Sequence, residues 1–203
     1  RIFNQGSLER GGRLYFGFWQ EISSEDRLAY LRIGDSPVVS LDFAQMAVHL
    51  AYAKVGAPPP GGDLYAHPRF PREGSKRMLT AMLAANAPFQ RMPHGLRQYF
   101  PKRVSVDDVV SELARRHSPL APLFFRGNSL EFMNLESQIL VKALLSMKAR
   151  GVVALPVHDC VLVAEGALQI AKEELAKASR EVVGVDIPLA VSALVHTRNT
   201  YLS

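Results

Sequence analysis

The chain has 203 residues and a mass of 22.4 kDa, which suffices for one core, or for one core with a small second lobe. No apolar run approaches the roughly 20 residues of a membrane helix, and the single cysteine, Cys160, excludes an internal disulfide framework and a multi-cysteine zinc site. We therefore expect a soluble protein of the reducing cytoplasm, without a membrane partner, and the net charge of +5 is compatible with a polyanionic partner.

Two strands, then a helix and a linker, are predicted in the N-terminal part of the chain. Residues 13–19 are rich in aromatic side chains and predict a strand after a Gly-Gly turn, and residues 37–43 predict a second strand. The apolar spacing from Gln45 to Val55 predicts a helix that ends at Gly56. Residues 58–62, with the sequence Pro-Pro-Pro-Gly-Gly, predict a linker.

Three more helices are predicted in the middle of the chain. They cover residues 74–87, residues 106–117 after an N-cap at Ser105, and residues 130–149. The first begins among basic residues, which oppose the helix macrodipole. A helix start of this kind is better tolerated where an anion binds, because cations and free N–H groups then act on one ligand.

Two short apolar runs between residues 152 and 163 flank His158 and Asp159, which predicts a β-hairpin with these two residues at its tip. A helix over 167–179 and a last strand over 189–195 follow. Strands that are only partly separated by helices, together with a hairpin, predict an α+β fold in which helices cover an antiparallel sheet.

Basic residues are grouped beside aromatic or proline-bearing segments. A solvated surface explains any one group, whereas several in a small chain favour a nucleic-acid partner. The groups are Arg69, Arg72, Lys76 and Arg77, then Arg97, Lys102 and Arg103, then Arg115 and Arg116.

Two aspartates combine into a candidate site. Asp42 ends a predicted strand and Asp159 lies at the hairpin tip, so neighbouring strands would bring the two carboxylates together. Two adjacent carboxylates both stay ionised at low energetic cost only if cations compensate their charges. A two-metal site provides such cations. Each aspartate alone is also a common turn former. Arg72 and Lys76 lie four positions apart, on one helix face, and could either bind a triphosphate or form a solvated basic surface.

Five segments resemble, in order, the motifs of family A DNA polymerases. Gly12-Arg13-Leu14 resembles the Thr-Gly-Arg-Leu element, and Leu41-Asp42-Phe43-Ala44-Gln45-Met46 resembles motif A. Gly62-Asp63-Leu64-Tyr65 is similar to the segment that precedes motif B. Arg72-x3-Lys76 resembles the start of motif B itself. Leu155-Pro156-Val157-His158-Asp159-Cys160 is similar to motif C.

The resemblance implies a palm with a reduced helical fingers element: palm over 1–56 and 129–203, fingers over 57–128. It implies an enzyme that extends a strand on DNA primer-template, or on RNA, from nucleoside triphosphates by a two-metal mechanism with Mg²⁺, or Mn²⁺ in its place. The implied roles are metal binding by Asp42, Phe43 (through its carbonyl) and Asp159, with Asp42 and Asp159 catalytic; nucleotide binding by Gln45, Arg72 and Lys76; and contact with the nucleic acid by Arg13 and His158.

Some positions depart from the family pattern. Asp42 and Asp159 are only 117 positions apart, which predicts shortened fingers. Ala47, Thr80 and Ala84 stand where the family has a glutamate and two aromatic residues, which weakens the expected selection against ribose. No segment resembles a thumb or a proofreading exonuclease, and either could precede Arg1.

Other interpretations stay open. The single-subunit RNA polymerases share these motifs, so an RNA-synthesising or primase-like enzyme is one alternative. A palm that binds nucleic acid but has lost turnover is a second. The third is an unrelated α+β domain, with His49, His94 and His117 as structural residues, and in every interpretation these histidines lack metal-ligand spacing.

Overall fold

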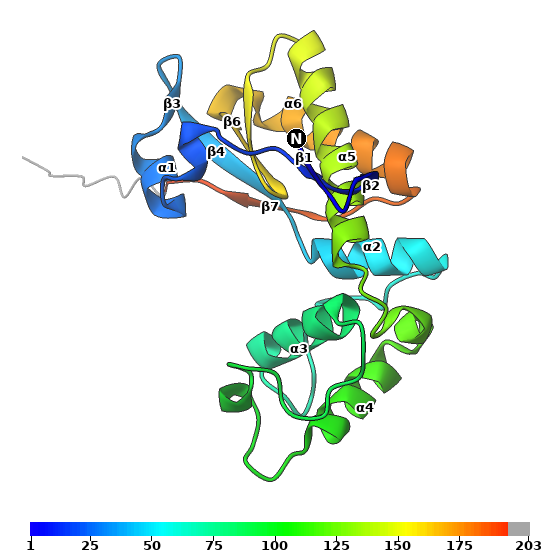
Figure 1. The fold of residues 1–203 in the computed structure, drawn as a ribbon. Coiled ribbons are helices and arrows are strands. Elements are labelled where there is room, and N and C mark those ends of the chain that lie inside the picture. The colour runs from blue at the N-terminus through cyan, green and yellow to red at the C-terminus, as the bar shows by residue number, and fades with distance from the viewer. Residues whose placement is uncertain (195–203) are drawn as a thin grey trace, which may run out of the picture. The chain divides into compact units, whose positions relative to one another are not determined.

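Strand β4 (Ser36–Phe43) is the centre of a five-stranded antiparallel sheet. In the computed structural model, which describes residues 1–194, it pairs with β6 (Cys160–Ala164) on one side and with β7 (Leu189–Ser192) on the other. The sheet is completed by β5 (Ala154–Val157), which pairs with β6, and by β3 (Arg32–Ile33), which pairs with β4. Figure 1 shows these strands with α5 (Ser129–Ala149) and α6 (Leu168–Val183) beside them.

Side-chain alternation along β4 gives the sheet two different faces. Val39, Leu41 and Phe43 are buried on one face, and α6 packs on β4 and β6. The other face carries Val38 and, four residues later, Asp42, which is exposed. An apolar face and a polar edge are thus both encoded in one eight-residue strand.

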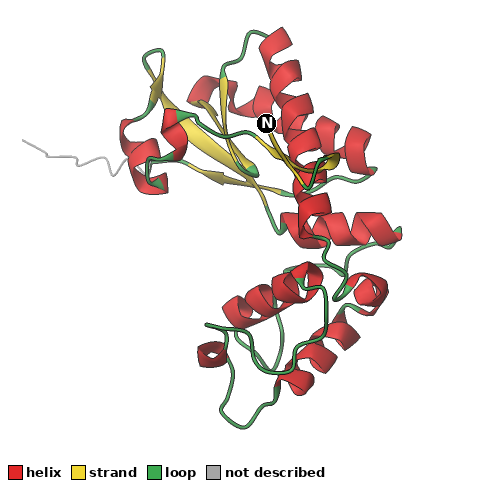
Figure 2. Cartoon of the chain, in the orientation of Figure 1, coloured by secondary structure: helices red, strands yellow, loops and turns green. Residues whose placement is uncertain are grey.

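Short helical segments cover part of the second face. Helix α1 (Ser24–Tyr30) contacts β4, and the 3₁₀ turn η1 (Phe18–Gln20) contacts β5. Trp19 and Leu28 pack there against a buried cluster centred on Val38 and Leu162. Figure 2 shows α1 and η1 in red among the strands in yellow.

The chain divides into two compact units. The first contains residues 1–2, 12–44 and the chain from Glu136 onward, and therefore the five-stranded sheet. The second contains residues 3–11 and 45–135. Its helices are α2 (Met46–Val55), α3 (Arg72–Ala84) and α4 (Val106–Arg116), with the 3₁₀ turns η2 (Arg97–Tyr99) and η3 (Ser118–Leu123). The remaining elements are β1 (Ile2–Asn4) and β2 (Ser7–Arg13), which pair with each other, and the 3₁₀ turn η4 (Glu165–Ala167).

The second unit is held together by packing and by one buried hydrogen-bonded histidine. Helices α3 and α4 contact each other, and Gly74 lets η2 approach α3, since a Cβ there would lie 2.8 Å from Cβ of Tyr99. His117 is fully buried: its Nε2 lies 3.0 Å from the carbonyl oxygen of Leu64 and its Nδ1 lies 2.9 Å from the hydroxyl of Tyr52. Because a carbonyl only accepts, Nε2 carries the proton and Nδ1 accepts from Tyr52.

The predicted α+β fold is confirmed, as is the antiparallel sheet with helices packed on it. The predicted cap is also present, because the Ser105 hydroxyl accepts from the N–H of Asp108 at 3.1 Å. Helix α3 begins two residues before the predicted start and ends at Ala84. Of the predicted last strand, β7 covers Leu189–Ser192, and Val195 lies outside the described residues.

The predicted strand over residues 13–19 is wrong. Gly11 and Gly12 lie inside β2 with φ of 75° and 96°, and the strand ends at Arg13. The segment then turns back, because the Gln20 side chain donates to the Leu14 carbonyl at 3.0 Å. Across residues 1–194, no helix combines the length and the apolar character needed to cross a bilayer.

Candidate active site

The first unit brings Asp42 next to Asp159. Asp42 pairs across the β4–β6 ladder with Cys160, the residue after Asp159, and the N–H of Phe43 donates to the Asp159 carbonyl at 3.3 Å. Both aspartates line one pocket of about 370 Å³ on the second face of the sheet. Groups 117 positions apart in the sequence therefore meet at one end of β4.

The β5–β6 turn places Asp159 through a strained residue. His158 has a φ of 54°, a conformation that costs energy for a residue with a Cβ, and such residues are concentrated at functional sites. Its ring is exposed and makes an edge contact with Tyr15, with centroids 6.1 Å apart. Partial desolvation, and then the nearby Arg13, lower the pKa of His158, whereas the charge of Asp159 opposes this shift.

Cys160 shares the pocket with the two aspartates. Its Sγ lies 2.8 Å from the Ser40 hydroxyl, on the strand that carries Asp42. Burial raises the pKa of this thiol to about 11, and the nearby carboxylates of Asp42 and Asp159 add to the effect. The thiol therefore stays protonated at neutral pH.

Arg13 is fixed by a carboxylate of α5. Its Nε and Nη2 donate to the two carboxylate oxygens of Glu136 at 2.6 and 2.8 Å, a bidentate ion pair. Burial raises the pKa of Glu136, whereas the Arg13 contact lowers it, and the negative charge of Asp159 raises the pKa of both partners. Arg13 is therefore a held side chain close to Asp159, and its Nη1 remains outside the pair.

In the second unit, Asp63 joins two of the residues assigned to nucleotide binding. Its carboxylate accepts from Gln45 Nε2 at 3.1 Å and from Arg72 Nε at 2.5 Å. The Arg72 hydrogen bond holds the pKa of Asp63 below its usual value. Gln45, which has a φ of 57°, also accepts from the N–H of Leu64 at 2.9 Å. Gln45 and Arg72 are thus positioned by protein contacts.

Lys76 differs from its neighbours on α3. Its side chain is exposed on the first turns of the helix. Arg77, by contrast, donates to Glu73 at 2.7 Å and its guanidinium lies 5.3 Å from the Tyr99 ring centre. Lys76 is therefore a cation that a ligand can approach, whereas Arg77 has a structural pairing.

The donor set of the first unit fits a magnesium site. Mg²⁺ typically takes one or two protein carboxylates and completes its shell with water and substrate phosphates. Asp42 and Asp159 supply two hard oxygen donors at one pocket. No group of three or more acidic, histidine or cysteine side chains that could hold a metal occurs in the part of the chain that the structure describes, so the remaining ligands would come from the backbone, substrate and water.

Comparison with solved structures finds a similar fold. The POL domain of Pol1 from M. smegmatis, in complex with DNA primer-template and dNTP, superposes with a TM-score of 0.53 over 82% of this chain, at 12% sequence identity. The fold is thus family A polymerase-like. This chain spans 41% of the length of that POL domain chain. No family model and no curated protein matches the sequence.

Two residues of this polymerase-like fold escaped the sequence-based interpretation. Glu136 lies on the buried side of α5, four residues after Phe132 and three before Ile139. A charge at such an apolar helix position needs a partner, which is the signal that could have identified it. Asp63 was recognised only as part of a motif, and its contacts with Gln45 and Arg72 depend on tertiary structure.

Proposed function

We propose that this protein is a metal-dependent nucleotidyl polymerase that extends a nucleic-acid strand on a DNA template. The observation that carries the proposal is the pairing of Asp42 with the residue after Asp159 on the central strands of a family A polymerase-like fold. That the POL domain of similar fold is in complex with DNA primer-template and dNTP supports these partners. We assign the palm to residues 1–56 and 129–203 and the reduced fingers to residues 57–128, on the positions of the motifs.

Each residue has a proposed role. Asp42, Asp159 and the Phe43 carbonyl would hold Mg²⁺, which would supply activation of a hydroxyl nucleophile and compensation of charge on the leaving group. The terminal hydroxyl of the strand attacks the α-phosphate of the nucleotide, and pyrophosphate leaves. Lys76, Arg72 and Gln45 bind the triphosphate, and Asp63 positions Arg72 and Gln45. Arg13 and His158 contact the nucleic-acid strand.

The proposal is tested by single-nucleotide extension of a labelled primer-template with Mg²⁺ or Mn²⁺, with dNTPs and NTPs in separate reactions. Asp159→Asn and Asp42→Asn should abolish extension while strand binding persists. Asp35→Asn, at an exposed aspartate of the β3–β4 turn in the same unit, is the matched control and should extend normally. Extension by purified Asp159→Asn at the wild-type rate would exclude the two-metal mechanism.

A second candidate function is nucleic-acid binding without turnover. The engagement of Gln45 and Arg72 with Asp63 favours it, because neither side chain then needs a nucleotide as its partner. An RNA-synthesising enzyme is the other alternative, and the parallel NTP reactions distinguish it. Strand binding without incorporation of any nucleotide, with either metal, would support the binding module.

A further inference from the structure

We propose that the segment Tyr15–Phe18 is a stacking platform for unpaired bases of a single-stranded nucleic acid. This proposal rests on the proposed function. The segment carries three exposed aromatic rings beside the turn that holds Asp159: Phe16 is 90% exposed, Phe18 is 66% exposed and Tyr15 is 39% exposed. Exposed aromatic rings in such a group mark a binding surface.

The platform is rigidly built. Trp19 Nε1 and the Gln20 side chain both donate to the carbonyl of Pro156 in β5, at 2.8 and 3.1 Å. The Gln20 carboxamide oxygen accepts from the N–H of Gly17 at 3.2 Å. Only glycine fits there, since a Cβ at position 17 would lie 2.4 Å from the Trp19 ring. The segment is therefore fixed to the hairpin of the active site.

This construction holds Phe16 out of the core. Phe16 has a φ of 74°, which is strained for an aromatic residue, and its ring gains no burial in return. Tyr15 and Phe16 lie with ring centroids 6.4 Å apart at an interplanar angle of 57°, and the edge of Tyr15 meets His158. Strain that the surrounding contacts maintain, with an exposed ring as the result, indicates a ligand for that ring.

The chemistry of the surroundings favours a nucleic acid over a protein partner. Arg13 and His158 adjoin Tyr15, and both can meet a phosphate or a base edge. His158 directly precedes Asp159 and its ring contacts Tyr15, so the aromatic segment adjoins the proposed active site. Aromatic stacking accepts any base, because every base has a flat π face. An unpaired base on Phe16 thus serves a polymerase that must accept all sequences.

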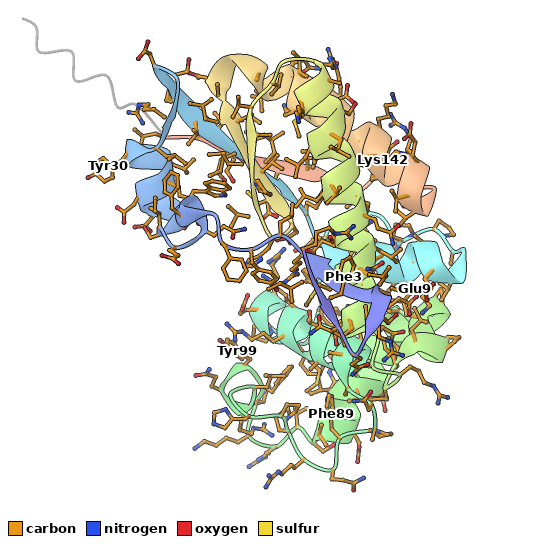
Figure 3. The ribbon with its side chains drawn as sticks, turned by 45° about the horizontal axis from the view of Figure 1, so that its top comes forward. Phe3, Glu9, Tyr30, Phe89, Tyr99 and Lys142 are labelled. Carbon is orange, nitrogen blue, oxygen red and sulfur yellow. The ribbon has the colours of Figure 1, made fainter. Side chains whose placement is uncertain are left out.

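The test measures binding without catalysis. The affinity of the intact chain for a fluorescently labelled single strand of about 12 nucleotides is measured by anisotropy in EDTA, without triphosphates. Phe16→Ala and Phe16→Leu should each weaken binding by about tenfold, because both remove the ring on which a base stacks. Phe16→Leu keeps an apolar side chain, so its effect reports the loss of stacking. Phe16→Trp keeps a stacking ring and should change the affinity by less than about twofold. Tyr30→Ala is the matched control: Tyr30 is 78% exposed on α1 and points away from the sheet (Figure 3).

An abasic strand of the same length should bind wild type and Phe16→Ala equally. Three results would each overturn the platform. Phe16→Leu could bind the single strand as tightly as wild type, or Phe16→Ala could weaken binding of the abasic strand as much as that of the normal strand. The third is that the wild-type protein does not bind the single strand. A Phe16→Ala change in sedimentation mass with unchanged strand affinity would instead identify a protein interface. These binding assays contain neither metal nor nucleotide. If they contradict the platform, the proposed function is still tested separately by the extension assay with Asp159→Asn.

Discussion

Arg13 and Glu136 form a bidentate ion pair within the first unit, although β2 and α5 lie 123 positions apart in the chain at these residues. The Glu136 side chain is 8% exposed, so its charge depends on this single arginine. A buried ion pair is costly to break from one side, because the other charge is left without a partner.

We expect Arg13→Ala to lower the free energy of unfolding by about 3 kcal/mol. Arg13→Lys should recover only part of the loss, since an ammonium group cannot make both hydrogen bonds. The double variant Arg13→Met/Glu136→Leu should be more stable than Arg13→Ala alone, because no buried charge remains. Urea titrations measure all three. Equal stability of Arg13→Ala and wild type would show that Glu136 is neutral or solvated.

His117 predicts a pH dependence of stability. Burial lowers its pKa to about 4 in the folded protein, against about 6.5 in the unfolded chain. Between these values the unfolded state binds the proton and the folded state does not, so stability is complete above pH 6.5 and falls as the pH drops toward 4. The loss amounts to about 3 kcal/mol. Unfolding curves at a series of pH values should show this slope in wild type.

The slope should become shallower in His117→Gln, where only other groups with lowered pKa values, such as His158, still contribute. It should be unchanged in His94→Gln, because His94 is exposed. Both variants contain the same carboxyl groups as wild type, so the difference between their slopes reports the contribution of the His117 imidazole. If His117→Gln keeps the wild-type slope, other groups cause the pH dependence.

Lys76→Ala should raise the nucleotide KM or lower kcat by more than tenfold, because a triphosphate contact strengthens as charge develops in the transition state. Affinity for the strand should change by less than about twofold, as expected for one exposed cation of many. Arg77→Ala, the adjacent cation that pairs with Glu73, is the control and should leave KM unchanged. A uniform, modest loss of strand affinity in both variants would assign Lys76 to a general basic surface.

Sugar selection should be weak. Ala47, Thr80 and Ala84 offer no bulk against a 2′-hydroxyl, and the structure removes one substitute gate, because the Tyr52 ring is buried and its hydroxyl bonds to His117. We expect kcat/KM for NTPs within about tenfold of dNTPs, which corresponds to at most about 1.4 kcal/mol. Single-nucleotide incorporation of a dNTP and of the NTP with the same base, in parallel reactions, measures this ratio of kcat/KM values.

A preference for dNTPs above about a thousandfold, or about 4 kcal/mol, would show that another side chain forms the gate. Phe89 is the remaining candidate, and its ring meets the Phe125 ring edge to face, with the ring centroids 5.2 Å apart. Phe89→Ala should then restore NTP incorporation, whereas it should have no effect on selection if the pocket has no gate.

The sequence predicts those features that depend on local pattern. Alternation marked β4, the polar pair between two apolar runs marked the turn of β5 and β6, and the Ser105 cap marked the start of α4. The sequence wrongly predicts a strand over residues 13–19 because the aromatic residues in this segment have a high intrinsic strand propensity. Contacts from Trp19 and Gln20 to Pro156, a residue far along the chain, override that preference. The Glu136 and Asp63 pairings escaped for the same reason, since their partners are set by tertiary structure.

The shielding of Cys160 has a practical consequence. With its pKa near 11 and its Sγ against Ser40, this sole thiol is about 0.01% thiolate at pH 7, and alkylating reagents attack only the thiolate. A cysteine introduced at an exposed site such as Tyr30 would react far faster. Fluorophores or spin labels can therefore be attached at chosen positions without first replacing the native cysteine, and the pocket of Asp42 and Asp159 stays chemically untouched.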